Sequence, residues 1–199
     1  MILYLVIILF SMSLTIGFNV IFNPSYEFYI YILLTIGFTI ASIILDAIVA
    51  IVIRKMPERL FDYKKKIFKT SKASYKFYKL IGVKKWKDKV PELGMFTGLR
   101  KNKIDNPKDP NYLSRYILEA TYGIIIHYLS APLAFLILLL DFKMYGGESN
   151  IWLTIALPVA VVNMVLILLP AFVLKYNLPK LVRLYEISLK RQDNPVSLN

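Results

Sequence analysis

The sequence predicts an all-α integral membrane protein: a four-helix transmembrane bundle with a basic cytoplasmic loop that is partly amphipathic-helical. Three observations predict this fold class. Hydrophobic residues make up 57% of the 199 residues, more than the roughly 45–50% apolar content of soluble domains. Apolar residues gather in four long runs, and the net charge of +12 is concentrated between the middle two. The chain has no cysteine and one histidine, which excludes a disulfide framework and a thiolate nucleophile, and we expect no metal site.

Each of the four runs is long enough to cross a bilayer, which takes roughly 20 apolar residues. We expect one membrane domain over residues 1–199, with spans at about 2–22, 28–53, 116–140 and 151–174. The first run has an alternative interpretation as a cleaved signal peptide. It lacks a basic start and a small-residue cleavage pattern, so a retained helix is favoured.

The distribution of lysine and arginine predicts the orientation. Residues 54–115 hold 19 basic and 6 acidic residues, whereas the connections 23–27 and 141–150 carry no excess of positive charge. Basic residues accumulate on the cytoplasmic side of a membrane. We therefore expect a multi-pass protein of the cell membrane, with the loop 54–115, the tail 175–199 and both termini in the cytoplasm.

The first half of this loop has the pattern of a helix at the membrane interface. One face of a helix there combines small, aromatic and aliphatic residues, and lysines cover the rest. The face consists of Ile67, Ser71, Ser74, Tyr75, Tyr78 and Ile81. The alternative is a solvated loop that only obeys the orientation rule. We expect no nucleic-acid partner, because the neighbouring spans explain the charge more simply.

Ionisable residues inside spans are costly and therefore candidates for function. Asp46 lies eight residues before Arg54, and His127 lies eight residues after Glu119. On ideal helices each spacing corresponds to about 12 Å. We expect a polar column that opens to the cytoplasm, with Asp46 and Glu119 near its mouth and His127 at its bottom.

Each of these residues also has a purely structural interpretation. Glu119 follows Arg115 by four residues and can form an ion pair along one helix. His127 can hydrogen-bond a neighbouring helix, and Asp46 can pair with a loop lysine. Asn163, in the middle of the last span, is of the type that joins helices in membranes.

Four motifs then occur in a recognisable order. They are RKMPERLF at 54–61, FYKLIGVKKWKDKVPE at 77–92, the pair Glu119 and His127, and KYNLPKL at 175–181. This order resembles the glycosyl-4,4'-diaponeurosporenoate acyltransferase family, small integral membrane proteins of carotenoid biosynthesis. The resemblance implies acyl transfer onto a sugar hydroxyl of a glycosylated carotenoid.

The resemblance also implies site residues. Glu119 and His127 match the ends of the motif in the third span. The other matching positions are Trp86, Lys87, Pro91 and Glu92 in the loop, and Tyr176 and Asn177 after the last span. The chain departs from the pattern at Ala120, where threonine is usual, at Tyr122, where a basic residue is usual, and at Ile124, where a second glutamate is usual.

These residues suggest a mechanism for an acyltransferase. His127 acts as the general base, and Glu119 orients the sugar. The substrate is bound by Asp46, Trp86, Lys87, Glu92, Tyr176 and Asn177. Trp86 either stacks on adenine or anchors the loop at the headgroups.

We expect no cofactor, with acyl-CoA or another acyl thioester as co-substrate. The expected partners are membrane lipids, the acyl donor and a lipid-embedded acceptor, and oligomers are possible. Two alternatives remain at this point: a non-catalytic accessory subunit or scaffold of a lipid or pigment assembly, and a transport component that functions as an oligomer.

Overall fold

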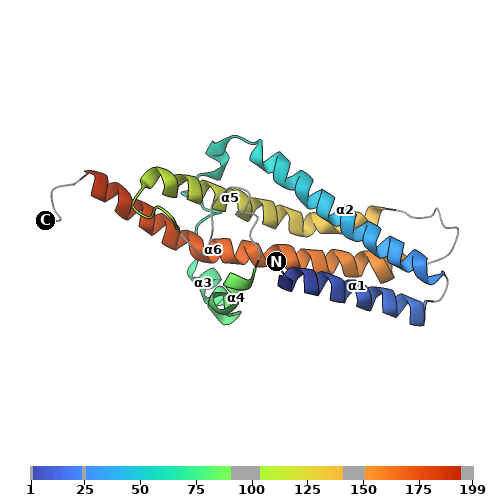
Figure 1. Cartoon of the computed structure of the whole chain (residues 1–199). Helices are drawn as coiled ribbons and strands as arrows, with labels where there is room; N and C mark the ends of the chain where they lie inside the picture. Colours follow the sequence, from blue (N-terminus) through green and yellow to red (C-terminus); the bar gives the residue numbers. More distant parts are fainter. Residues whose placement is uncertain (1, 24–25, 91–103, 141–150, 194–199) are drawn as a thin grey trace. The chain divides into compact units, whose positions relative to one another are not determined.

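The computed structural model describes residues 2–23, 26–90, 104–140 and 151–193, and its regular structure is helical throughout these ranges (Figure 1). Four long helices dominate: α1 (Ile2–Phe22), α2 (Phe28–Arg54), α5 (Pro110–Leu133) and α6 (Leu157–Asp193). The segments that are long and apolar enough to cross a membrane are Tyr4–Phe22, Phe28–Arg54, Pro110–Leu139 and Leu153–Gln192. The predicted all-α fold with four membrane-spanning helices is confirmed.

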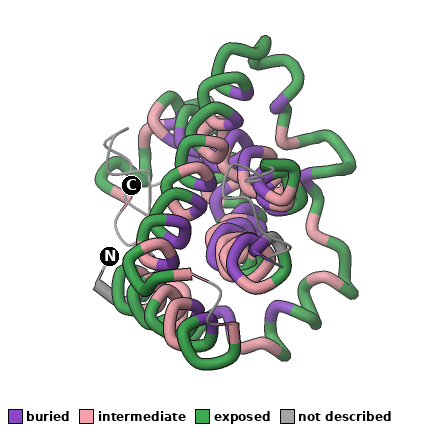
Figure 2. Tube along the Cα trace, turned by 90° about the vertical axis from the view of Figure 1, so that its right-hand side faces the viewer, coloured by how far each residue is buried: buried purple, intermediate pink, exposed green. Residues whose placement is uncertain are grey.

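The helices belong to two compact units. Residues 1–53 and 126–169 form unit 1, and residues 54–125 and 170–199 form unit 2. Both α5 and α6 contribute residues to each unit. Buried and exposed positions alternate around the long helices (Figure 2). In unit 1 the exposed positions are often large apolar side chains such as Phe10 and Ile21 of α1, as expected for a surface that faces lipid.

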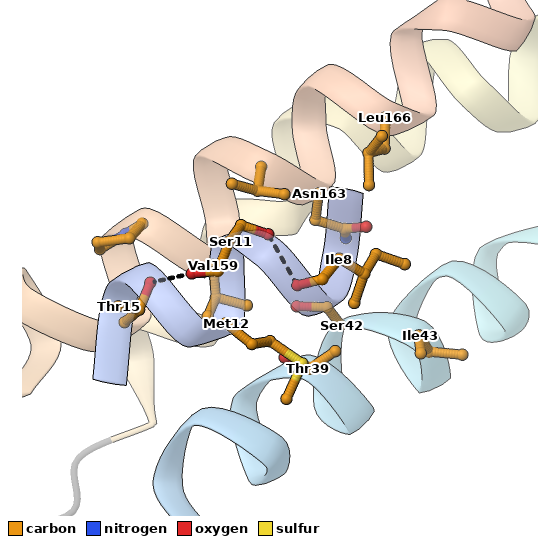
Figure 3. A pocket seen from close by; sticks show the side chains of 12 residues that line it. Ile8, Ser11, Met12, Thr15, Thr39, Ser42, Ile43, Val159, Asn163 and Leu166 are labelled. Atoms are coloured by element: carbon orange, nitrogen blue, oxygen red, sulfur yellow. Dashed lines mark hydrogen bonds between the residues drawn. The ribbon is translucent and has the colours of Figure 1, made fainter. Parts of the chain in front are cut away.

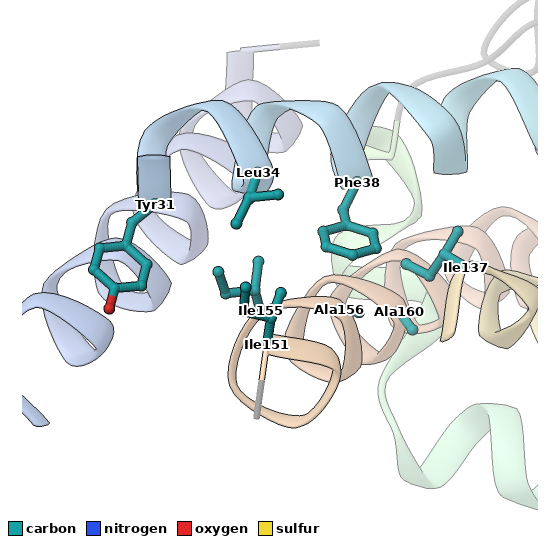
Figure 4. Close-up of a cluster of buried hydrophobic side chains, with 8 residues drawn as sticks. All are labelled: Tyr31, Leu34, Phe38, Ile137, Ile151, Ile155, Ala156 and Ala160. Carbon is teal, nitrogen blue, oxygen red and sulfur yellow. The ribbon is translucent and has the colours of Figure 1, made fainter. Parts of the chain in front are cut away.

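The core of unit 1 joins α2 to the end of the third span and to the beginning of the fourth span (Figure 4). A short 3-10 helix, η4 (Ala134–Leu139), continues α5. A short π-helix, η6 (Trp152–Ala156), precedes α6. The core consists of Tyr31, Leu34, Phe38, Ile137, Ile151, Ile155, Ala156 and Ala160. The two alanines have no exposed surface, and small residues of this kind let membrane helices approach closely.

Polar side chains attach α1 to the rest of unit 1. The Asn19 amide donates hydrogen bonds to the carbonyls of Thr15, at 2.8 Å, and Thr154, at 3.0 Å. The Tyr4 hydroxyl donates to the Leu166 carbonyl at 3.0 Å. Hydrogen bonds between helices are a main source of helix association in lipid.

Unit 2 contains the short helices of the basic loop. They are η1 (Glu58–Phe61), α3 (Lys72–Leu80), α4 (Val83–Trp86) and η2 (Lys87–Lys89). The Ser71 side chain caps α3 by accepting a hydrogen bond from the Ser74 backbone N–H at 3.0 Å, as serine does at many helix starts. Gly82, with a positive φ of 66°, follows the end of α3, where a residue without Cβ fits the left-handed turn.

The predicted membrane face of this loop is partly wrong. Helix α3 begins at Lys72, so Ile67 precedes the helix instead of extending its face. Tyr78 is buried and packs on Phe172 of α6 with ring centroids 5.8 Å apart. One residue of the predicted membrane face, Tyr78, therefore packs inside unit 2 and anchors α3 to α6.

Candidate functional site

A polar junction lies inside unit 1, where Asp46 of α2, Asn163 of α6 and Ser130 of α5 come together. The Asn163 amide donates a hydrogen bond to Asp46 Oδ2 at 3.3 Å. The Ser130 side chain lies near the same carboxylate but forms no hydrogen bond with it. Ser130 Oγ and Asp46 Oδ1 are buried and have no hydrogen-bond partner among the described residues. Such atoms are costly to bury alone, so this junction has capacity for a further polar group.

His127 is on the same helix as Ser130 and precedes it by three residues. That spacing puts both side chains on neighbouring parts of one helix face, within about 60° of each other. The imidazole is half-buried and forms no hydrogen bond or ion pair with any residue that the structure describes. The alternative interpretation of His127 required a structural hydrogen bond to a neighbouring helix. The described residues provide no such bond, so both ring nitrogens are available.

A small, mostly apolar pocket adjoins this junction, between α1, α2 and α6 of unit 1 (Figure 3). Its volume is about 50 Å³. The polar lining comprises Ser11, Thr15, Thr39, Ser42 and Asn163.

Most of the hydroxyl groups in this pocket are satisfied by their own helix. Ser11 and Thr15 donate to the carbonyls of Ile7 and Ser11, at 2.7 and 2.9 Å. The exception is Ser42, which is only 2% exposed and has no hydrogen-bond partner among the described residues. Asn163 lines the pocket and donates to Asp46, so the pocket and the junction adjoin each other.

In unit 2, Glu119 forms an ion pair with Arg54, the last residue of α2, at 2.8 Å. The structural interpretation from the sequence had Arg115 as the partner, and the structure gives Arg54 instead. The Arg54 guanidinium also lies over the Tyr122 ring, 5.9 Å from its centroid, and Tyr122 packs on Phe61. The resemblance implies a basic residue at position 122. In this chain Tyr122 stands there and belongs to an aromatic cluster instead.

The post-span motif organises the loop that precedes α3. Lys175 is only 8% exposed, and its ammonium donates to the carbonyls of Ile67 and, at 3.2 Å, Lys69. The Thr70 hydroxyl donates back to the Lys175 carbonyl at 3.0 Å. The sequence placed Lys175 only as the first residue of the motif at 175–181 and did not predict this contact. A lysine directly after a long apolar run is the one signal that pointed to it.

The two predicted substrate-binding residues beside Lys175 differ in their surroundings. The Tyr176 side chain is 5% exposed and stacks on Tyr75 of α3, with centroids 5.8 Å apart and rings 3° from parallel. Asn177 is half-buried. Tyr176 therefore joins α3 to α6, and a role of either residue in substrate binding stays a prediction.

The loop motif is described only up to Val90. The Trp86 indole is half-buried and donates to the Ile81 carbonyl at 2.8 Å. Lys87 is half-buried, and Lys84, Lys85 and Lys89 are exposed. Glu92, with Pro91 before it, lies outside the described residues.

The predicted site residues fall in both units. Asp46 and His127 belong to unit 1, and Glu119, Trp86, Lys87, Tyr176 and Asn177 belong to unit 2. The single column proposed for Asp46, Glu119 and His127 stays a prediction. Among the residues that the structure describes, no three His, Cys, Asp or Glu side chains gather in a way that could hold a metal ion.

Comparison with curated proteins and with solved structures found no significant match. The sequence profile of one family, described as glycosyl-4,4'-diaponeurosporenoate acyltransferase, matches residues 57–187. This range covers well over half of the chain and includes Glu119, His127, Tyr176 and the loop around Trp86. The chain therefore belongs to the glycosyl-4,4'-diaponeurosporenoate acyltransferase family.

Proposed function

We propose that this protein is a membrane-bound acyltransferase. It moves a fatty acyl group from an acyl thioester to a hydroxyl of a lipid-embedded glycosylated carotenoid or a similar glycolipid. Family membership supports the reaction class. The observation that carries the assignment to a site is the uncommitted His127 imidazole, one helical turn from the partly unsatisfied junction of Asp46, Asn163 and Ser130.

The chemistry requires a base, because the acceptor hydroxyl does not ionise near neutral pH. His127 takes the proton as the hydroxyl oxygen attacks the thioester carbonyl and forms a C–O bond. The tetrahedral intermediate then collapses, the C–S bond breaks, and the imidazolium returns the proton to the departing thiolate. The products are an ester and a free thiol, so no oxidant, metal or cofactor enters the balance.

The remaining site residues take supporting roles in this proposal. Asp46 contributes to binding of the acceptor, and Glu119 orients its sugar. The exposed lysines around Trp86 attract the anionic part of a thioester donor, since lysine binds phosphate as a point charge. Lys87, Glu92, Tyr176 and Asn177 complete the donor side.

The location follows from the same reasoning. The protein resides in the cell membrane with both termini in the cytoplasm, because the basic residues concentrate in 54–115 and 175–199. A water-soluble thioester then reaches the site from the cytoplasm, while the acceptor stays in the bilayer.

Lipid mass spectrometry tests the proposal. Cells that make a glycosylated carotenoid carboxylate express the wild type, His127→Ala or Leu129→Ala. Leu129 is on the same helix and 43% exposed, which makes it a matched control. We expect a species heavier by one fatty acyl group from the wild type and Leu129→Ala. Product from His127→Ala should fall by a factor of about 10²–10⁴, the usual contribution of a general base.

Two outcomes contradict parts of this proposal. Equal product from wild type and His127→Ala removes His127 from the base role and keeps the reaction. No acylated species from any variant, with each protein verified in the membrane, contradicts the reaction with this acceptor.

A second candidate function is a non-catalytic accessory subunit of a lipid or pigment assembly. One observation favours it: Ile124, at the position where the resemblance implies a second glutamate, has no exposed surface. A stable complex with a pathway enzyme that is unaffected by His127→Ala, together with no acylated product, distinguishes this role from catalysis.

A further inference from the structure

Helix α3 carries an apolar stripe that unit 2 covers only in part. Ala73, Phe77 and Leu80 are exposed, Phe77 by 45% and Leu80 by 85%. Their spacing of four and three residues puts them on one face of the helix. Helix α3 is not one of the four segments long enough to cross a membrane, so spanning the bilayer does not explain this exposure.

The opposite face fixes the orientation of α3 within unit 2. Tyr78, about 100–160° around the helix from the residues of the stripe, is 4% exposed and packs on Phe172. Tyr75 stacks on Tyr176 of α6. The loop before α3 is attached to Lys175 through its carbonyls. Phe77, at the edge of the stripe, also packs on Phe172, with ring centroids 5.7 Å apart. Ala73, Leu80 and the exposed part of Phe77 are therefore the surface of the stripe that unit 2 leaves uncovered.

A row of positive charge runs beside the stripe. Lys72, Lys76 and Lys79 repeat the spacing of the stripe, shifted by one residue, and all three are exposed. None of them forms an ion pair with a residue that the structure describes. The Lys79 ammonium lies over the Tyr75 ring, 5.0 Å from its centroid. Exposed Lys84 and Lys85 extend the basic surface into α4.

An apolar stripe next to a lysine row is the pattern of a helix that lies in the membrane interface. The cytoplasmic leaflet is anionic and attracts such lysines. The bilayer is also within reach, because only residues 55–71 separate α3 from the end of the second span at Arg54. Charge complementarity and this short connection favour a lipid surface over a protein partner.

We propose that α3 docks on the anionic surface of the bilayer. Phe77 and Leu80 insert at the level of the headgroups, and Lys72, Lys76 and Lys79 contact lipid phosphates. This face differs from the one expected from the sequence, because Tyr78 and Tyr75 are occupied by α6. The proposal is independent of the acyltransferase assignment. It states that anionic lipid holds α3, and with it the basic loop, at the membrane surface.

The test uses the absence of native cysteine. Leu80→Cys is labelled with the environment-sensitive fluorophore NBD, and the full-length protein is reconstituted in vesicles of phosphatidylcholine alone or with phosphatidylglycerol. We expect NBD emission to shift to shorter wavelength in the anionic vesicles, with quenching by lipids that carry a nitroxide near the headgroup. Lys190→Cys, exposed on α6 in the same unit, is the matched control and should show neither change.

A charge variant separates the lysine contribution from the apolar one. With Lys72, Lys76 and Lys79 all changed to Gln, the NBD response at position 80 should lose its dependence on phosphatidylglycerol. Each lysine near the surface changes binding about fivefold. Thermal unfolding of the Lys190-labelled charge variant verifies that unit 2 still folds. Unshifted emission in both vesicles, or the same shift with and without anionic lipid, overturns the proposal.

Discussion

Arg54 has two partners whose contributions can be separated by substitution. Its guanidinium pairs with Glu119 and lies over the Tyr122 ring. The Arg54 side chain is 40% exposed and that of Glu119 is 21% exposed, so water screens this ion pair. A pair of this kind is worth about 0.2–1 kcal/mol, which is too little to explain a carboxylate at a candidate site by stability alone.

A double-mutant cycle with Arg54→Gln, Glu119→Gln and the combined variant tests this estimate. We expect a coupling free energy below about 1 kcal/mol, because both groups are partly solvated. Thermal unfolding of the detergent-solubilised protein measures it. Glu119→Gln should reduce acyl transfer more than Arg54→Gln, since the proposed role of Glu119 is to orient the sugar. Equal losses of activity would show that Glu119 acts only through the ion pair.

Partners of this kind are hard to predict from sequence. Arg115 is one turn from Glu119 along the chain, and helical spacing favours such neighbours. The actual partner is 65 positions away. Asp46 and Asn163, 117 positions apart, were each identified as polar residues within spans, but their hydrogen bond depends on how α2 and α6 pack. Side-chain type is therefore predictable where side-chain pairing is not.

At the scale of helices, one glycine controls the contact between α5 and α6 in unit 2. A Cβ atom added at Gly123 would lie 2.7 Å from Leu174 Cδ1, whereas nothing lies within 4 Å of one added at Gly37. Small residues at such positions allow helices to approach closely. The two glycines therefore form a matched pair for substitution.

We expect Gly123→Val to destabilise the protein by about 1 kcal/mol, the low end of the usual cost of overpacking, because the clashing atom is the end of the flexible Leu174 side chain. Gly37→Val should change stability by less than about 0.5 kcal/mol, as surface substitutions do. Combining Gly123→Val with Leu174→Ala should recover part of the loss, because the clashing methyl group is removed. Denaturation in detergent measures all three, and a Gly37→Val loss equal to that of Gly123→Val would contradict the packing argument.

Helix existence was predictable and helix ends were not. A segment of about 20 apolar residues satisfies its backbone in lipid only as a helix, so the four spans followed from composition. The last span was predicted to end at Leu174, yet α6 continues to Asp193. Hydropathy marks where apolar residues stop, but good helix formers continue the helix beyond that point. For α3, the lysine spacing predicted an amphipathic helix. Which face of α3 points into unit 2 was not predictable, because it is set by contacts with aromatic residues of α6.

At the scale of the whole molecule, the charge distribution predicts one orientation in the membrane. Single-cysteine variants test it without background, because the chain has no cysteine. A membrane-impermeant maleimide should label Glu27→Cys in intact cells, and Lys65→Cys and Lys190→Cys only in inverted vesicles. All three native side chains are exposed. Labelling of Lys65→Cys in intact cells would contradict a cytoplasmic loop.

The division into two units gives this protein a built-in spectroscopic readout. The chain has two tryptophans: Trp86 belongs to unit 2, and Trp152, the first residue of η6, belongs to unit 1. Replacing either one by phenylalanine leaves a single indole fluorophore. Intrinsic emission then reports on one unit at a time, so the same chain can reveal whether its two units melt together or in sequence.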